Sequence, residues 1–233
     1  MRQLPNALTL ANLFCGCCAL LYTLYWQPDT AAWFTVASFV FDYLDGMAAR
    51  ALKVSSPLGK ELDSLADVVS FGVVPGAMLY QMLSGSPAGE TGVVTMALPA
   101  FVLSAFSGLR LGKFNLDTRQ THYFLGLSTP ASTVLVLGLA LSVHYNRFGM
   151  AGIISDNPWI LYLLIAVLCT LLISEIPMFG MKIKFANWKD NAVNVFFVVL
   201  FAVLFLLLKE LALTVIIVLY ILISVIFRKK VTG

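Results

Sequence analysis

Stretches of mostly apolar residues recur from one end of this chain to the other, and they constrain its fold more than any other feature. A membrane-spanning helix needs roughly 20 such residues. Only 12% of the 233 residues are charged, whereas a soluble domain carries about 25%. The sequence therefore predicts an all-α, polytopic membrane helix bundle. Its eight predicted transmembrane helices run over Leu8–Trp26, Thr30–Ala51, Leu62–Leu83, Thr91–Leu111, Ser128–Tyr145, Pro158–Ile176, Asn191–Leu208 and Leu211–Phe227.

The distribution of lysine and arginine orients this bundle. Cytoplasmic loops of membrane proteins carry an excess of these residues. With eight spans both termini share one side of the membrane, and 13 of the 15 Lys and Arg residues then fall on that side. Only Arg147 and Lys209 fall on the other. The pattern predicts an integral protein of the cytoplasmic membrane with both termini in the cytoplasm.

The N-terminal apolar run and the cysteines have simple interpretations. No small-residue cleavage site follows the first apolar run and the hydrophobicity continues, so we expect a first transmembrane helix rather than a signal peptide. The cysteines lack the spacing of a metal site, and packing between helices accounts for Cys15, Cys17, Cys18 and Cys169. We expect residues 1–233 to form a single integral membrane domain, with its catalytic helices at about 30–83.

Four aspartates interrupt the second and third apolar stretches. An aspartate at the centre of a bilayer costs about 2.5–3.5 kcal/mol, so such residues normally face the bundle interior or an aqueous cavity. At about 100° per residue, Asp42 and Asp45 share one helix face, as do Asp63 and Asp67 on the next helix. A short turn joins the two helices, and we expect it to bring both faces together.

A cluster of this kind predicts a metal site. Four carboxylates in a small space of low dielectric constant repel one another unless cations neutralise them. Carboxylates are the ligands that Mg²⁺, Mn²⁺ and Ca²⁺ prefer, and two ions suit four carboxylates that hold a phosphate ester.

Small and basic residues beside the aspartates fit a nucleotide ligand. Gly46, Ala49 and Gly59 leave room for a ligand to approach the backbone, although small residues also pack helices together. Arg50 and Lys53 could hold pyrophosphate oxygens, pair with the aspartates or simply lie at the membrane surface. Between the two helices, Ser56 and Pro57 predict a helix start, with the serine as N-cap.

The string from Asp42 to Asp67 resembles a known signature. It contains D-Y-L-D-G-M-A-A-R, eight further residues and G-K-E-L-D-S-L-A-D. The signature of the CDP-alcohol phosphotransferase family is D-x-x-D-G-x-x-A-R, eight or nine residues, then G-x-x-x-D-x-x-x-D, and every specified position is filled. The resemblance implies that Asp42, Asp45 and Asp63 are metal ligands and that Asp67 shares a metal and serves as the general base. It further implies CDP contacts from Gly46, Ala49, Arg50, Gly59, Asn6 and Thr9.

Other segments resemble one branch of that family, the phosphatidylserine synthases. These segments are P-N-A-L-T-L-A-N-L-F-C-G from Pro5, G-L-R-L-G-K-F-N from Gly108 and F-L-G-L-S-T-P from Phe124, with departures from the usual pattern at Gly112, Lys113 and Ser128. The resemblance implies that CDP-diacylglycerol and L-serine are the substrates and Mg²⁺ or Mn²⁺ the cofactor. It also implies membrane lipid as a partner, no nucleic acid partner, and a homodimer.

The expected chemistry is direct transfer of a phosphatidyl group, which gives phosphatidylserine and CMP without a covalent enzyme intermediate. The cytoplasmic cations best placed to bind the serine carboxylate are Arg110, Lys113 and Arg119. His122 lies either near the acceptor or in solvent.

Three alternatives remain at this point. The acceptor could be another alcohol, such as glycerol-3-phosphate or inositol phosphate, which an acceptor screen separates. A cation transporter could also use intramembrane aspartates, but it would move ions without releasing CMP. A lipid-binding protein without catalytic activity would tolerate Asp67→Asn.

Overall fold

The computed structural model describes residues 3–54, 56–85, 92–116, 124–178 and 192–226. Arg119 and His122 lie outside the described residues, and so do the basic residues at positions 2, 182, 184, 189 and 228–230.

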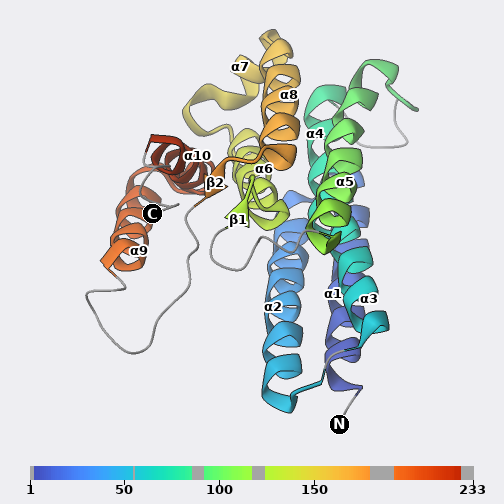
Figure 1. Cartoon of the computed structure of the whole chain (residues 1–233). Helices are drawn as coiled ribbons and strands as arrows, with labels where there is room; N and C mark the ends of the chain where they lie inside the picture. The colour runs from blue at the N-terminus through green and yellow to red at the C-terminus, as the bar shows by residue number, and fades with distance from the viewer. Residues whose placement is uncertain (1–2, 55, 86–91, 117–123, 179–191, 227–233) are drawn as a thin grey trace.

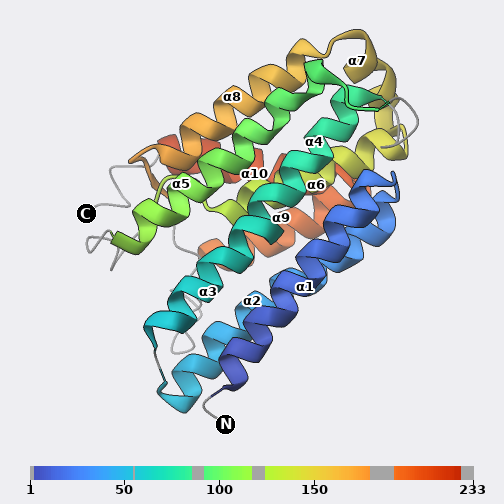
Figure 2. The same cartoon turned by 90° about the vertical axis from the view of Figure 1, so that its right-hand side faces the viewer.

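The first half of the chain folds into four long helical rods (Figure 1). The first two are α1 (Leu4–Leu24) and α2 (Pro28–Leu52). The third is continuous (Figure 2) and consists of α3 (Pro57–Val68), the π-helical turn η1 (Val69–Val73) and α4 (Val74–Ser84). The fourth combines the 3₁₀ helix η2 (Thr95–Phe101) with α5 (Val102–Leu116).

The second half contains shorter helices and one minimal ribbon. Its helices are α6 (Thr129–His144), η3 (Arg147–Gly149), α7 (Met150–Asp156), α8 (Trp159–Ile173), α9 (Ala192–Leu208) and α10 (Leu211–Ile226). The strands β1 (Phe124–Leu125) and β2 (Pro177–Met178) pair antiparallel, with Phe124 opposite Met178. The ribbon ties the segment before α6 to the segment after α8.

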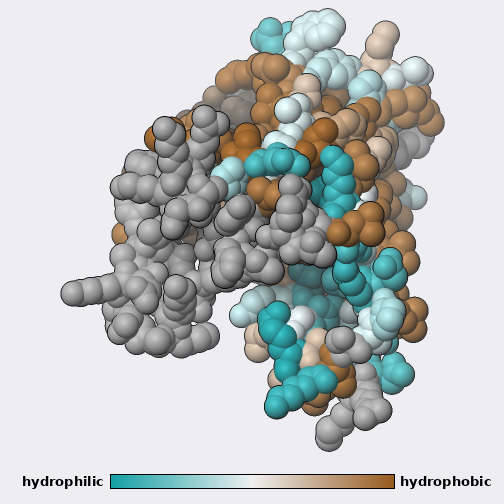
Figure 3. Space-filling model, viewed as in Figure 1, coloured by the Kyte–Doolittle hydropathy of each residue, from teal (hydrophilic) through white to brown (hydrophobic). Residues whose placement is uncertain are grey.

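The prediction of an all-α membrane protein is confirmed, apart from this two-residue ribbon. Each of the eight predicted stretches overlaps a helix of the structure, which by itself does not establish eight spans. Within the described residues, three helical segments are long and apolar enough to cross a membrane, namely Leu4–Leu24, Pro57–Ser84 and Thr95–Leu116. The bent pair Thr129–His144 with Arg147–Asp156 makes a fourth if it is counted as one span. Exposed apolar side chains cover much of the right-hand flank in Figure 3, as expected for a surface that faces lipid.

The predicted start of α3 is also confirmed. Ser56 is the N-cap, and its hydroxyl accepts a hydrogen bond of 2.9 Å from the Gly59 amide. Pro57 occupies the first turn, where its missing N–H costs nothing. This cap ends the short connection from α2. It fixes the residue at which α3 begins, and therefore the position of the α3 carboxylates along the helix.

Close packing between α6 and α10 attaches the last helix to the bundle. A Cβ atom on Gly138 would lie 2.6 Å from Leu213 Cβ, so only glycine permits this approach. The Thr214 hydroxyl donates to the Leu135 carbonyl at 2.9 Å. The core beside this contact includes the fully buried Leu161 of α8.

Charged side chains tie helices together at both ends of the bundle. At the end that holds the α2–α3 turn, Lys60 Nζ donates to the Asn115 carbonyl at 2.8 Å and so ties α3 to α5. Hydrophilic side chains gather around this turn, in the lower part of Figure 3. At the opposite end, Arg147 Nε donates to Glu210 Oε2 at 2.7 Å and Arg147 Nη2 to Glu210 Oε1 at 3.2 Å. This bidentate ion pair joins the turn after α6 to the turn before α10.

The Arg147–Glu210 pair predicts a pH-dependent contribution to stability. The hydrogen bonds from Arg147 hold the pKa of Glu210 in the folded protein below its ordinary value. The ion pair therefore stabilises the fold fully at pH values above the unfolded-state pKa of about 4.3. This stabilisation is lost as the pH falls through the folded-state pKa of Glu210. We expect Glu210→Gln to lower the free energy of unfolding at pH 7 by about 1 kcal/mol. The difference from wild type should vanish near pH 3, as measured by thermal unfolding in detergent.

The matched control is Asp156→Asn, which alters an exposed carboxylate at the end of α7. It should leave the unfolding temperature unchanged at both pH values. A Glu210→Gln protein as stable as wild type at pH 7 would show that the ion pair contributes nothing.

Candidate active site

Three of the four predicted aspartates meet between α2 and α3. Asp42, Asp63 and Asp67 are half-buried, and each offers a carboxylate oxygen within 4.8 Å of the oxygens offered by the other two. Within this group, Asp42 of α2 and Asp67 of α3 bring their carboxylates together from neighbouring helices. Two carboxylates at that separation repel strongly unless a proton or a cation lies between them.

The donor set fits a hard divalent cation. Ligand oxygens of Mg²⁺ lie about 2.0–2.1 Å from the ion, so opposite ligands are about 4 Å apart. Oxygens within 4.8 Å of one another can therefore collect around one ion after small adjustments. Among the described residues, this is the only group of three or more acidic, histidine or cysteine side chains with such geometry.

Asp45 takes a different position from the other three. It is only 6% exposed, and its Oδ2 accepts a hydrogen bond of 2.6 Å from the Thr9 hydroxyl of α1. It lies outside the compact group of three oxygens, although Asp42 and Asp63 are within electrostatic range of it. The fourth carboxylate thus borders the same space from the side of α1.

Asn12 is a site residue for which no role was predicted. Its side chain is completely buried, and its Nδ2 donates to Asp67 Oδ1 at 3.3 Å. The polar or small residues of α1 recur every three or four positions at Asn6, Thr9, Asn12 and Gly16. This spacing places them on one helix face. It is the sequence pattern from which a role for Asn12 at the site could have been predicted.

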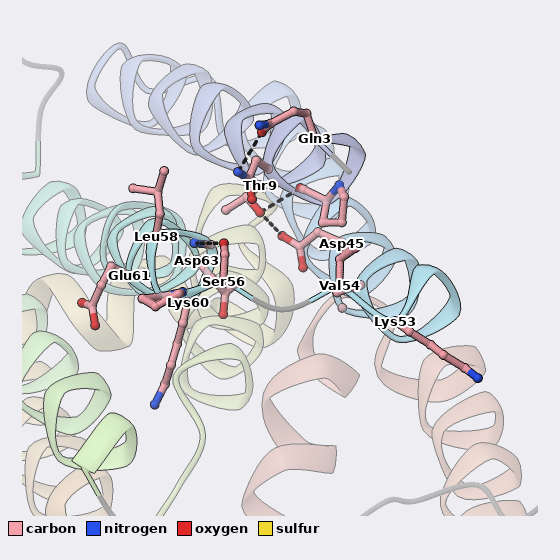
Figure 4. A pocket seen from close by; sticks show the side chains of 16 residues that line it. Gln3, Thr9, Asp45, Lys53, Val54, Ser56, Leu58, Lys60, Glu61 and Asp63 are labelled. Atoms are coloured by element: carbon pink, nitrogen blue, oxygen red, sulfur yellow. Dashed lines mark hydrogen bonds between the residues drawn. The ribbon is translucent and has the colours of Figure 1, made fainter. Parts of the chain in front are cut away.

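A cavity of about 1040 Å³ opens beside the aspartates, at the junction of α1, α2 and α3 (Figure 4). Among the residues that line it are Asp45, Asp63 and five of the six predicted CDP contacts, namely Asn6, Thr9, Gly46, Ala49 and Gly59. Gly59 is close-packed, because an added Cβ would lie 3.1 Å from Asn6 Oδ1.

Arg50 is the predicted CDP contact that does not line the cavity. It is exposed, and its guanidinium folds back to 3.5 Å from the position of a Gly46 Cβ. The lining also includes Gln3, Ser56 and Lys60, for which no ligand role was predicted.

Comparison with known proteins agrees with this geometry. The family model described as CDP-alcohol phosphatidyltransferase matches residues 2–172, which include the aspartates, the cavity and α1. The chain belongs to this family. The match also covers α5 and α6, so the family resemblance extends well beyond the aspartate motif.

Several relatives carry the name CDP-diacylglycerol–serine O-phosphatidyltransferase. The chain is 39% identical over 135 residues to a Helicobacter pylori protein, covering 57% of this chain and 55% of the relative. It is 36% identical over 187 residues to a Mycobacterium leprae protein (76% and 58%) and 37% identical over 152 residues to a Bacillus subtilis protein (65% and 81%). The chain thus spans just over half the length of the first two.

A π-helical turn directly follows the last aspartate of the family motif. Such turns are rare and concentrate at functional sites. Two carbonyls of η1 are contacted by hydroxyl groups of neighbouring helices. Ser104 Oγ donates to Gly72 O at 2.8 Å, and the single hydrogen of Thr133 Oγ1 is shared between Phe71 O at 3.1 Å and Thr129 O of its own helix at 2.9 Å. Side chains of α5 and α6 therefore stabilise the irregular backbone beside Asp67.

Two of the predicted acceptor cations, Arg110 and Lys113, lie in the described residues, and of these two Arg110 is in the interior. Arg110 of α5 is 7% exposed, and its Nε has no hydrogen-bond partner in the described part of the chain. Asp67 and Tyr220 lie within electrostatic range of its guanidinium, which also lies 5.9 Å from the centroid of the Phe114 ring. Lys113 is exposed.

Close contact between α1 and η1 predicts a sensitive glycine. A Cβ on Gly16 would lie 2.3 Å from Ser70 Oγ and 3.1 Å from Ser70 Cα, so Gly16→Ala must push α1 away from the turn that follows Asp67. We expect it to reduce the free energy of unfolding by about 1–3 kcal/mol, measured by thermal unfolding in detergent.

Gly152→Ala is the matched control, since an added Cβ there meets nothing within 4 Å. In a helix this change is neutral or stabilising. Equal unfolding temperatures for the two variants would contradict the packing argument.

Proposed function

We propose that this chain is a divalent-metal-dependent enzyme that transfers the phosphatidyl group of CDP-diacylglycerol to the hydroxyl of L-serine. The observation that carries the proposal is the cluster of Asp42, Asp63 and Asp67 beside a cavity large enough for a nucleotide, built from a complete family motif. The names of the relatives support the serine acceptor.

The aspartates would hold the cofactor. We assign Asp42, Asp45, Asp63 and Asp67 to two Mg²⁺ or Mn²⁺ ions, which when bound would neutralise pyrophosphate charge and stabilise the leaving group. Gly46, Ala49, Arg50, Gly59, Asn6 and Thr9 would contact the CDP portion. The small residues of this set keep the cavity open next to the backbone of α2 and α3.

The proposed reaction is a direct displacement at phosphorus. Asp67 accepts the proton of the serine hydroxyl, and the serine oxygen forms a bond to the β-phosphorus of CDP-diacylglycerol. The bond between that phosphorus and the bridging oxygen breaks, and CMP leaves with the electron pair. Asp67 suits the base because it is enclosed and directed by Asn12 toward the shared space.

Arg110 is the proposed partner of the serine carboxylate. Its buried Nε lacks a partner among the described residues, and a guanidinium binds a carboxylate with two parallel hydrogen bonds. The proximity of Arg110 to Asp67 would place the acceptor hydroxyl near its base. Lys113, which is exposed, and Arg119 are weaker candidates on this argument.

The topology that we propose has eight spans, with both termini and the active site on the cytoplasmic side. Residues 1–233 would form a single domain that is embedded in the cytoplasmic membrane. The opposite placement of Arg147 and Lys60 along the bundle supports the predicted charge partition. We also propose a homodimer on the basis of family resemblance.

The deciding experiment measures CMP release by the purified full chain from CDP-diacylglycerol with Mg²⁺ or Mn²⁺, and offers serine, glycerol-3-phosphate and inositol phosphate in parallel. Serine-dependent release that EDTA abolishes is the expected result. Turnover with only one of the other two alcohols would identify that alcohol as the acceptor in place of serine. Silence with all three alcohols would refute phosphatidyl transfer, and ion flux into liposomes would then favour the transporter.

Asp67→Asn should nearly abolish turnover. Loss of a general base reduces the rate by about 10²–10⁴-fold, and the amide is also a poorer metal ligand. CMP release under saturating substrates is the measurement, with the distant Asp156→Asn as the control. A variant that retains more than about a tenth of wild-type turnover would remove Asp67 from the role of base.

Arg110→Gln should weaken serine binding selectively. Loss of a charge-assisted bond to the serine carboxylate should raise the serine KM about tenfold or more, because such bonds contribute about 1.5–3 kcal/mol. The KM for CDP-diacylglycerol should change less than about twofold, which is well under 1 kcal/mol. Equal increases in both KM values would contradict the assignment, and a selective effect of Lys113→Gln instead would transfer it to Lys113.

A further inference from the structure

We propose that one turn of α1 sets the geometry of the metal site, with Asn12 as a positioning residue for Asp67 and Thr9 as its counterpart for Asp45. This inference rests on the proposed function, because it assigns to both residues a role in the same reaction. It goes beyond that function by placing a determinant of metal binding on a helix that carries no carboxylate at the site.

The two contacts connect α1 to both halves of the motif. Thr9 Oγ lies 2.6 Å from Asp45 Oδ2 on α2, and Asn12 Nδ2 lies 3.3 Å from Asp67 Oδ1 on α3. Residues three apart in a helix face the same side. The distance between these two donors is therefore set by the pitch of α1, and that distance fixes how far apart the two carboxylates sit.

Each hydrogen bond also selects which carboxylate oxygen remains available. The bond from Asn12 engages one lone pair of Asp67 Oδ1, so Oδ2 is the less engaged oxygen for other partners. The Thr9 hydroxyl carries one hydrogen and lies 2.6 Å from Asp45 but 3.0 Å from the Pro5 carbonyl, so the shorter contact to Asp45 is favoured. Side chains around a metal orient its ligands through bonds of this kind.

The backbone around Asn12 is fixed independently of its side chain. The Asn12 carbonyl accepts hydrogen bonds from Ser38 Oγ of α2 at 3.1 Å and from Ser70 Oγ of η1 at 3.2 Å. Gly16, one turn further along, permits the close approach of Ser70. Three elements therefore meet at this carbonyl, and neither bond involves the Asn12 side chain.

The side-chain amide of Asn12 does not contribute to the stability of the fold. Asn12 is 0% exposed, yet its Oδ1 has no hydrogen-bond partner among the described residues. A buried acceptor without a partner destabilises a protein, and replacing such a group with an apolar one of the same shape can be neutral or stabilising. An asparagine in this position is explained by its bond to Asp67 and not by packing.

The test compares Asn12→Leu with wild type in the full-length protein, in detergent. Mn²⁺ binding without substrates is followed by the electron paramagnetic resonance signal of the free ion, and steady-state CMP release is measured on the same preparations. We expect the Mn²⁺ dissociation constant to rise about tenfold or more, as for other residues that orient metal ligands. We also expect kcat to fall by a similar factor, the serine KM to change less than about twofold and the metal-free unfolding temperature to stay within a few degrees.

Thr9→Val provides the second arm, with the same shape and no donor for Asp45, and it should also weaken Mn²⁺ binding. Ser38→Ala is the matched control, because it removes a bond to the backbone of Asn12 and leaves the amide in place. It should lower the unfolding temperature without altering Mn²⁺ binding.

Two outcomes would overturn the inference. One is an Asn12→Leu protein with wild-type Mn²⁺ affinity and kcat. The other is a loss of activity that matches a loss of folded protein, since Asn12 would then have a structural role. A wild-type protein that binds Mn²⁺ but releases no CMP would refute the proposed function alone, and the effect of Asn12→Leu on Mn²⁺ binding would still decide the positioning role.

Discussion

Mutual repulsion among carboxylates is the constraint on which the rest of this structure depends. Asp42, Asp63 and Asp67 bring ligand oxygens within 4.8 Å of one another inside a helix bundle of a membrane protein, where the dielectric constant is low and water is scarce. Such a cluster would force its helices apart unless cations neutralise it and the surrounding helices hold it together. The fold supplies the second condition through the connections that surround the site.

Those connections are short-range and specific. Ser56 caps α3 directly after the turn from α2, so the two carboxylate-bearing helices are joined with almost no slack. Lys60 ties α3 to the end of α5, and hydroxyl groups from α5 and α6 bond the carbonyls of the π-helical turn that follows Asp67. On the remaining side, α1 packs against α2 and α3 and reaches two of the aspartates directly. The cavity beside the aspartates opens within this set of connections.

Much of the fold and the centre of the site could be predicted from the chain itself. Apolar stretches predicted the helices because a bilayer requires about 20 such residues, and the Asp42–Asp67 motif predicted that α2 and α3 bring their carboxylates together. The sequence alone did not distinguish residues whose surroundings depend on a third helix. Asp45 was grouped with the other aspartates, and the structure adds that it bonds to Thr9 and lies beside the compact group of three oxygens. Asn12 received no role, and the exposed Lys113 was ranked beside the buried Arg110.

The sequence by itself determined the helical membrane class, the helix start at Ser56 and the local spacing of the aspartates, because these depend on hydrophobicity, capping and helical periodicity within a few turns. Only the tertiary structure decided that α1 lies against the carboxylates, that a π-helical turn follows Asp67 and that Arg110 is buried near Asp67. These features arise from contacts between residues far apart in the sequence, as the Asn12–Asp67 bond with its separation of 55 residues illustrates. No local pattern encodes such a pairing, since it is set by how whole helices pack.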